Sequence, residues 1–174
     1  MTTEITVKSE KIFEGKIINL RVDTVELDNK KYAKREIVEH KSAAAVLAIN
    51  EEGQVLLVRQ YRKAIESYLC EIPAGILNIA EDPKDAALRE LKEETGFVAG
   101  KIDLIYEFYT SPGFSNEKVY LFKAEDLTFT STDFDEDESI ETIAVTKDEA
   151  KKMIETGRIT DSKTLIALLH WLHN

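Results

Sequence analysis

The segment from Gly75 to Phe97, which reads GILNIAEDPKDAALRELKEETGF, constrains the fold more than any other part of the chain. Alanine and leucine residues in its second half favour a helix. Glu90 and Glu94 are four residues apart, so a helix places them on one face, with Cβ atoms roughly 5–6 Å apart. Like charges at this spacing destabilise an isolated helix. A hard divalent cation with oxygen ligands would turn that repulsion into a binding site.

The residues at the two ends of this segment predict where the helix begins and ends. Asp82 is a good N-cap residue, and Pro83 suits the first helical position. Gly96 stands where a left-handed C-terminal cap is usually found. Within the helix, Arg89 precedes Glu93 by one turn, so its guanidinium could orient that carboxylate through a charge-assisted hydrogen bond.

A glutamate-rich helix also has a simpler interpretation, a solvated surface face, and this would be preferred for the cluster alone. The spacing of the whole segment favours a functional site instead. At nine fixed positions the chain resembles the signature of the Nudix hydrolases. The matching residues are Gly75, Glu81, Arg89, Glu90, Leu91, Glu93, Glu94, Gly96 and Phe97. The resemblance implies hydrolysis of a nucleoside diphosphate linked to another group, with Mg²⁺ as the cofactor or Mn²⁺ in its place.

Composition excludes several other classes of protein. A chain of 174 residues is long enough for one domain with a real core. The net charge of −10 argues against nonspecific nucleic-acid binding, which needs a basic surface. The single Cys70 cannot form an internal disulfide, as expected in a reducing compartment. Neither an N-terminal apolar signal nor a long apolar run is visible, so we expect a cytoplasmic protein without a membrane partner.

Hydrophobic periodicity predicts many strands and few helices, which indicates an α/β (α+β) fold. By resemblance this is a Nudix-type α/β/α sandwich with a mixed sheet and an N-terminal antiparallel strand segment. Two hairpins are expected, one turning at 28–31 and one at 50–53. We expect residues 1–40 to form the N-terminal strand segment and residues 41–174 the Nudix domain. The expected strands are 6–13, 17–27, 32–39, 44–49, 55–60, 68–72, 104–109, 118–123 and 141–145, and the further helices are 147–155 and 162–172.

A proline outside the signature bears on the substrate. Pro112 follows Phe97 by fifteen residues and lies in the sequence SPGFSNE. Taken alone, Ser-Pro-Gly is an ordinary turn. Together with KREIVEH at 34–40, RQYR at 59–62 and EIPAG at 71–75, it resembles the ADP-ribose pyrophosphatase branch of the family. That branch implies cleavage of ADP-ribose, a nucleoside diphosphate sugar, to AMP and ribose 5-phosphate, with Ser111 and Pro112 positioning the terminal ribose.

The resemblance also assigns roles to individual residues. Glu90, Glu94 and the backbone carbonyl of Ala74 would hold the cations, with help from Glu93, the residue that Arg89 is placed to orient. Candidate substrate contacts are Arg35, Arg62 and Glu117. The guanidinium of an arginine is planar and bidentate, which suits adenine stacking or phosphate binding. A surface salt bridge is an equally good interpretation of both arginines.

The acidic run at 133–141, DFDEDESIE, has two interpretations. Such a run is usually solvated. Related pyrophosphatases place a catalytic glutamate in a mobile loop here, and by that resemblance Glu138 is the first choice as base or metal ligand. Glu136 is the alternative. A base on a loop would act only when substrate closes the site.

Other expectations concern assembly and alternative functions. Relatives in this branch are homodimers that exchange N-terminal strands, so the resemblance implies a homodimer built through residues 1–40. Another nucleotide sugar or a dinucleoside polyphosphate is an alternative substrate. A non-catalytic ADP-ribose sensor is the alternative from a different functional class, but such sensors normally have an incomplete glutamate set, and here the set is complete.

Overall fold

The computed structural model describes residues 3–131 and 140–174. The chain divides into two compact units, one containing Met1–Ser42 and Phe108–Lys118 and the other containing Ala43–Glu107 and Val119–Asn174. The segment 108–118 thus belongs to the same unit as the N-terminal strands.

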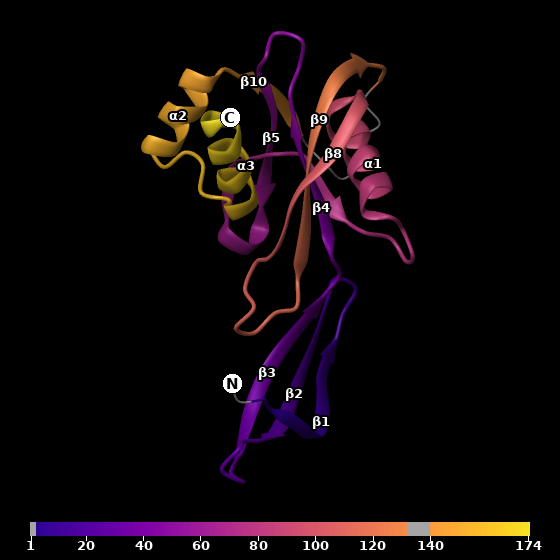
Figure 1. The fold of residues 1–174 in the computed structure, drawn as a ribbon, viewed down its shortest axis with the longest axis vertical. Helices are drawn as coiled ribbons and strands as arrows, with labels where there is room; N and C mark the ends of the chain where they lie inside the picture. Colours follow the sequence, from indigo (N-terminus) through magenta and orange to yellow (C-terminus); the bar gives the residue numbers. More distant parts are fainter. Residues whose placement is uncertain (1–2, 132–139) are drawn as a thin grey trace. The chain divides into compact units, whose positions relative to one another are not determined.

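The N-terminal unit is built on a three-stranded antiparallel sheet in the order β1-β2-β3 (Figure 1). The predicted turn between β2 and β3 is confirmed, because the Leu27 amide donates to the Lys31 carbonyl at 2.8 Å and Lys30 has a left-handed φ of 62°. The strands are β1 (Ile5–Glu14), β2 (Ile18–Glu26) and β3 (Tyr32–His40).

In the residues described, the second unit contains two sheets and three α-helices. A mixed four-stranded sheet has the order β7-β4-β9-β8, in which β4 and β9 are parallel. An antiparallel sheet has the order β10-β5-β6. The elements are β4 (Ala43–Ala48), β5 (Val55–Arg62), the 3₁₀ turn η1 (Lys63–Ile65), β6 (Ser67–Glu71), β7 (Ala74–Ile76), α1 (Pro83–Thr95), β8 (Phe97–Tyr109), β9 (Lys118–Phe129), β10 (Glu141–Val145), α2 (Lys147–Glu155) and α3 (Ser162–His173).

Local chemistry sets the ends of α1 as the sequence predicts. The Asp82 carboxylate accepts a hydrogen bond from the Lys84 amide at 2.8 Å, and Pro83 occupies the first turn. At the other end, Gly96 has φ 76° and its amide donates to the Lys92 carbonyl at 2.8 Å. Glycine suits this position because its φ is left-handed.

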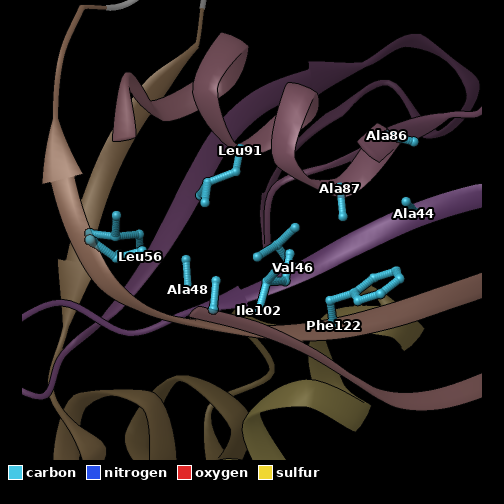
Figure 2. Packing of buried hydrophobic residues seen from close by; sticks show 11 residues of the cluster. Ala44, Val46, Ala48, Leu56, Ala86, Ala87, Leu91, Ile102 and Phe122 are labelled. Carbon is cyan, nitrogen blue, oxygen red and sulfur yellow. The ribbon is translucent and has the colours of Figure 1, made fainter. Parts of the chain in front are cut away.

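A core of small and branched side chains fixes α1 on the mixed sheet. Ala86, Ala87 and Leu91 on the helix are fully buried against Val46 of β4 and Phe122 of β9 (Figure 2). The alanines let the helix approach the sheet closely, so its glutamates lie near the backbone of β7.

Helices cover both faces of the central strand β4. Every residue from Ala44 to Ala48 is buried, as expected for a strand with packing on two sides. Helix α1 packs on one side, and α3 contacts the strand from the other (Figure 1). This arrangement confirms the predicted α+β sandwich with a mixed sheet. None of the helices in the described part of the chain is long and apolar enough to span a membrane.

Three expectations about strands were wrong. The segments 44–49 and 55–60 do not form a hairpin, because both edges of β4 are occupied by β7 and β9. The predicted turn at 50–53 is present, because the Asn50 amide donates to the Gln54 carbonyl at 2.9 Å. An isolated antiparallel bridge between Ile49 and Val55 joins the ends of β4 and β5 beside it. Strand β8 begins at Phe97 rather than residue 104, and the short strand β7 was not expected.

Candidate active site

Gly75 of β7 makes room for the carboxylate of Glu90 on α1. A Cβ built at Gly75 would lie 2.0 Å from Glu90 Oε1, 2.1 Å from Cδ and 2.4 Å from Oε2. These separations are far shorter than any van der Waals contact. The Glu90 side chain is only 12% exposed. The glycine is therefore required here for a close approach of side chain to backbone rather than for an unusual φ.

Glu94, one turn further along α1, is held against the same strand. It is 7% exposed, and its Oε2 accepts a hydrogen bond from the Ala74 amide at 3.0 Å. The Thr142 hydroxyl of β10 donates to the Glu94 backbone carbonyl at 3.2 Å. The two glutamates predicted to share a helix face thus both lie at the backbone of residues 74 and 75.

The guanidinium of Arg89 binds three carboxylates. Its Nη1 lies 2.6 Å from Glu90 Oε1 and 2.9 Å from Glu93 Oε2. Its Nε is 2.9 Å from Glu81 Oε1, and its Nη2 is 3.1 Å from Glu81 Oε2 and 3.2 Å from the Ile76 carbonyl. The bidentate geometry with Glu81 is the kind that only an arginine provides.

These contacts perturb the pKa values of the partners. Hydrogen bonds from the Arg89 guanidinium and from the Asn78 amide lower the pKa of Glu81 to about 2. Hydrogen bonding to Glu81, and then to Glu90 and Glu93, raises the pKa of Arg89 above its ordinary value despite partial burial. Glu81, Glu90, Glu93 and Glu94 outnumber this one cation, so the cluster keeps an excess of negative charge.

The donor set suits a hard divalent cation. Carboxylate and carbonyl oxygens are the ligands that Mg²⁺ and Mn²⁺ prefer, and the cradle at Gly75 keeps the Glu90 carboxylate against the backbone of β7. In the described residues no group of three or more acidic, histidine or cysteine side chains is already arranged as a metal site. Arg89 binds the Glu90 carboxylate through Oε1, which fixes the orientation of this candidate ligand.

Arg62 of β5 forms an ion pair with the buried Glu71. Its Nε and Nη2 donate to the two carboxylate oxygens of Glu71 at 2.7 and 2.9 Å, and Glu71 also binds Lys163 of α3. Glu71 is 2% exposed. Burial raises its pKa, but the hydrogen bonds from Arg62 and Lys163 outweigh this and leave the pKa below its usual value. Glu71 and Lys163 were not predicted; the only signal was a lone acid in the apolar run YLCEIP.

The other predicted substrate residues lie in the N-terminal unit. Arg35 on β3 pairs with Glu4, its Nε donating at 3.0 Å and its Nη2 binding the second oxygen. The turn that contains Ser111 and Pro112 is closed by the Ser115 amide, which donates to the Ser111 carbonyl at 2.8 Å.

Hydrogen bonds join this turn to β3. The Val38 amide donates to the Phe114 carbonyl at 2.7 Å, so the unit brings the turn and the strand of Arg35 together. Glu117 accepts a hydrogen bond from the Thr110 hydroxyl at 2.6 Å and lies 3.5 Å from His40 Nδ1. Glu138 and its alternative Glu136 lie outside the described residues.

Comparison with known families identifies the class of protein that this fold and this glutamate cluster define. Residues 39–168 match the NUDIX domain, and residues 4–38 match the nucleoside diphosphate sugar hydrolase N-terminal domain. The chain therefore belongs to the Nudix family, and it is a Nudix hydrolase. The resemblance inferred from nine signature positions is confirmed.

Individual relatives give a finer comparison. The chain is 48% identical to the ADP-ribose pyrophosphatase of Bacillus subtilis (strain 168), over 95% of this chain and 90% of the relative. It is 47% identical, over the same shares, to the methanol dehydrogenase activator of Bacillus methanolicus. It is 34% identical to the GDP-mannose pyrophosphatase of Enterobacter sp. (strain 638), over 97% and 95%. A crystal structure of an ADP compounds hydrolase has the same fold, with a TM-score of 0.87, 22% identity and coverage of 98% and 94%.

Proposed function

We propose that this Nudix hydrolase cleaves the pyrophosphate of ADP-ribose, in a reaction that depends on a divalent cation, to give AMP and ribose 5-phosphate. The observation that carries the catalytic part is the placement of Glu90 and Glu94 at the backbone of Ala74 and Gly75, with Arg89 binding Glu90. The choice of ADP-ribose rests on the similarity to the Bacillus subtilis enzyme. In the reaction one water oxygen bonds to phosphorus, one bridging P–O bond breaks, and two phosphate monoesters leave.

Glu90, Glu94 and the Ala74 carbonyl are the groups proposed to hold Mg²⁺, or Mn²⁺ in its place, with Glu93 assisting. When bound, such cations neutralise phosphate charge, lower the pKa of water and stabilise the leaving oxygen. The protein holds the carboxylates of the proposed ligands in position to bind the cation. Arg89 fixes Glu90 and Glu93, and its bidentate pairing with Glu81 fixes Arg89 in turn.

The remaining roles concern the proton and the substrate. Glu138 is proposed as the base that accepts the water proton, with Glu136 as the alternative. Arg62 already uses Nε and Nη2 on Glu71, so a substrate contact would come from its third nitrogen. Arg35, Glu117 and the Ser111–Pro112 turn are proposed to bind the nucleotide and the terminal ribose.

A second candidate is the cleavage of another nucleotide sugar, which the similarity to the GDP-mannose pyrophosphatase favours. The two candidates are separated by kcat/KM values for ADP-ribose, GDP-mannose and a dinucleoside polyphosphate. We expect kcat/KM for ADP-ribose to exceed the others by about tenfold or more, as the similarity to the Bacillus subtilis ADP-ribose pyrophosphatase suggests. A higher kcat/KM for GDP-mannose would show that the assignment of ADP-ribose is wrong. Glu94→Gln should lower kcat/KM for every substrate by the same factor.

A homodimer built through the N-terminal strands is also proposed. All of β1 is exposed, including Ile5, Val7, Ile12 and Phe13, each more than half exposed. In the described residues β1 pairs only with β2, which leaves an open edge. Exposed apolar side chains beside an open edge favour an isologous partner. Light scattering should give twice the monomer mass, and a fully active monomer at nanomolar concentration would overturn this.

The location of the protein in the cytoplasm stays a prediction.

A further inference from the structure

A buried chain of hydrogen bonds joins the start of α3 to the segment that leads into the candidate metal site. Thr164, in the first turn of α3, is fully buried, and its Oγ1 accepts a hydrogen bond from the Ile72 amide at 2.9 Å. The two residues are 92 positions apart in the chain. Ile72 itself is 1% exposed, so water cannot replace the Thr164 hydroxyl as the acceptor for its amide.

The Thr164 hydroxyl is itself held in one orientation. It donates to Asp161 Oδ2 at 2.6 Å, and the Thr164 amide donates to the same oxygen at 3.0 Å. Asp161 is the N-cap of α3. Lys163 lies 3.1 Å from Asp161 Oδ2 and also binds Glu71, the residue before Ile72. Two side chains of the first turn of α3 therefore contact neighbouring residues of this segment, Lys163 at the Glu71 carboxylate and Thr164 at the Ile72 amide.

The backbone from Ile72 to Ala74 makes a hydrogen bond at each of its three residues. The Ile72 amide binds Thr164, the Pro73 carbonyl accepts from the Val46 amide at 2.9 Å, and the Ala74 amide donates to Glu94 at 3.0 Å. The second contact comes from the central strand and the third from the signature helix. Only the first comes from α3, which lies outside the signature segment.

We propose that Thr164 is a positioning residue: through the Ile72 amide it holds the backbone on which the Ala74 carbonyl is presented to a divalent cation. The inference rests on the metal site in the proposed function. Groups that orient metal ligands typically change metal affinity by 10–100-fold when they are removed. Without the Thr164 hydroxyl, the buried Ile72 amide would lack an acceptor, which is energetically costly. The backbone would then shift until this amide reached another acceptor, and the Ala74 carbonyl would shift with it.

The test is Mn²⁺ binding to the metal-free protein, measured by electron paramagnetic resonance without substrate. Thr164→Val keeps the shape of the side chain but removes both hydrogen bonds of the hydroxyl. We expect Mn²⁺ to bind about tenfold more weakly, while kcat at saturating Mn²⁺ stays within about threefold. Thr164→Ser should restore the affinity, and hydrogen exchange at the Ile72 amide should be faster in the valine variant only.

A matched pair of variants separates positioning from lost stability. Asp161→Ala and Thr146→Ala each remove the N-cap of one helix, α3 and α2 respectively. We expect similar losses in melting temperature, but only Asp161→Ala should weaken Mn²⁺ binding, by about threefold or more. This pair also decides the matter if Thr164→Val does not fold, because wild-type affinity in Asp161→Ala would overturn the proposal.

The Glu94→Gln variant distinguishes failure of this inference from failure of the proposed function. If wild-type protein binds Mn²⁺ and Glu94→Gln loses it, while Thr164→Val binds normally, Thr164 is only structural and the inference is wrong. If the wild-type protein does not bind Mn²⁺, the proposed metal site is wrong, and the role of Thr164 falls with it.

Discussion

Replacing Gly75 with alanine would add one methyl group at the point where β7 meets the Glu90 carboxylate. The new Cβ would lie 2.0 Å from Glu90 Oε1, so the carboxylate must move by at least about 1 Å to reach the shortest contact between nonbonded atoms. Gly75 is not among the glycines with positive φ, so alanine fits the backbone without strain. The displaced group is the end of a flexible side chain, and we expect the free energy of unfolding to change by less than about 1 kcal/mol.

Activity should respond far more strongly than stability. A misplacement of about 1 Å at a catalytic group can cost about a hundredfold in rate, which corresponds to about 2.7 kcal/mol of transition-state stabilisation. Steady-state kinetics with ADP-ribose at saturating Mg²⁺, together with thermal unfolding, measures both quantities. Gly100→Ala, a glycine-to-alanine change on β8, is the control and should keep wild-type kcat.

A double-mutant cycle tests whether the effect passes through Glu90. Glu90→Gln alone should also lower kcat about a hundredfold, because a catalytic cation loses one ligand. The double variant Gly75→Ala/Glu90→Gln should then resemble either single variant, since both remove the same interaction. A near-wild-type kcat for Gly75→Ala, or a loss of about ten-thousandfold in the double variant, would refute the reasoning.

Three further predictions follow from individual residues. Ala80 has a left-handed φ of 60°, so Ala80→Gly should raise the free energy of unfolding by about 0.5–1 kcal/mol in urea titrations, and a decrease would contradict this. The pKa of Glu81 is lowered to about 2, so its stabilising contribution is complete above about pH 4.5 and is lost as the pH falls toward 2. Melting temperature should therefore depend less on pH in this range for Glu81→Gln, and an unchanged slope would argue against the Arg89 contact. Glu138→Gln should lower kcat strongly and change KM only a few fold, with Glu136→Gln much milder; the reverse order would move the base to Glu136.

The features that the sequence predicted well depend on residues close together in the chain. The caps of α1 at Asp82 and Gly96 are set within one turn of the helix, and both were placed correctly. The contact of Arg89 with Glu93 likewise follows from helical spacing, because the two residues are four positions apart. Local chemistry decides such features before any tertiary contact forms, so a single sequence contains enough information to predict them.

The features that were missed depend on partners far away in the chain. Strand β4 is separated from β5 because β7 and β9 occupy its edges, and β9 begins 75 residues after β4 starts. The hydrogen bond between Thr164 and Ile72 spans 92 positions, and nothing in the local pattern marks either residue. Arg62 could equally be a surface residue or a ligand contact until its buried partner Glu71 is seen.

The most direct test of the central claim is an analysis of the products formed from ADP-ribose, with Mg²⁺ and with a chelator, by chromatography against known standards. We expect one AMP and one ribose 5-phosphate for each ADP-ribose consumed, only when Mg²⁺ or Mn²⁺ is present, and about a hundredfold slower formation by Glu90→Gln. Equal rates in the chelator, other products, or no consumption of ADP-ribose with either cation would contradict it.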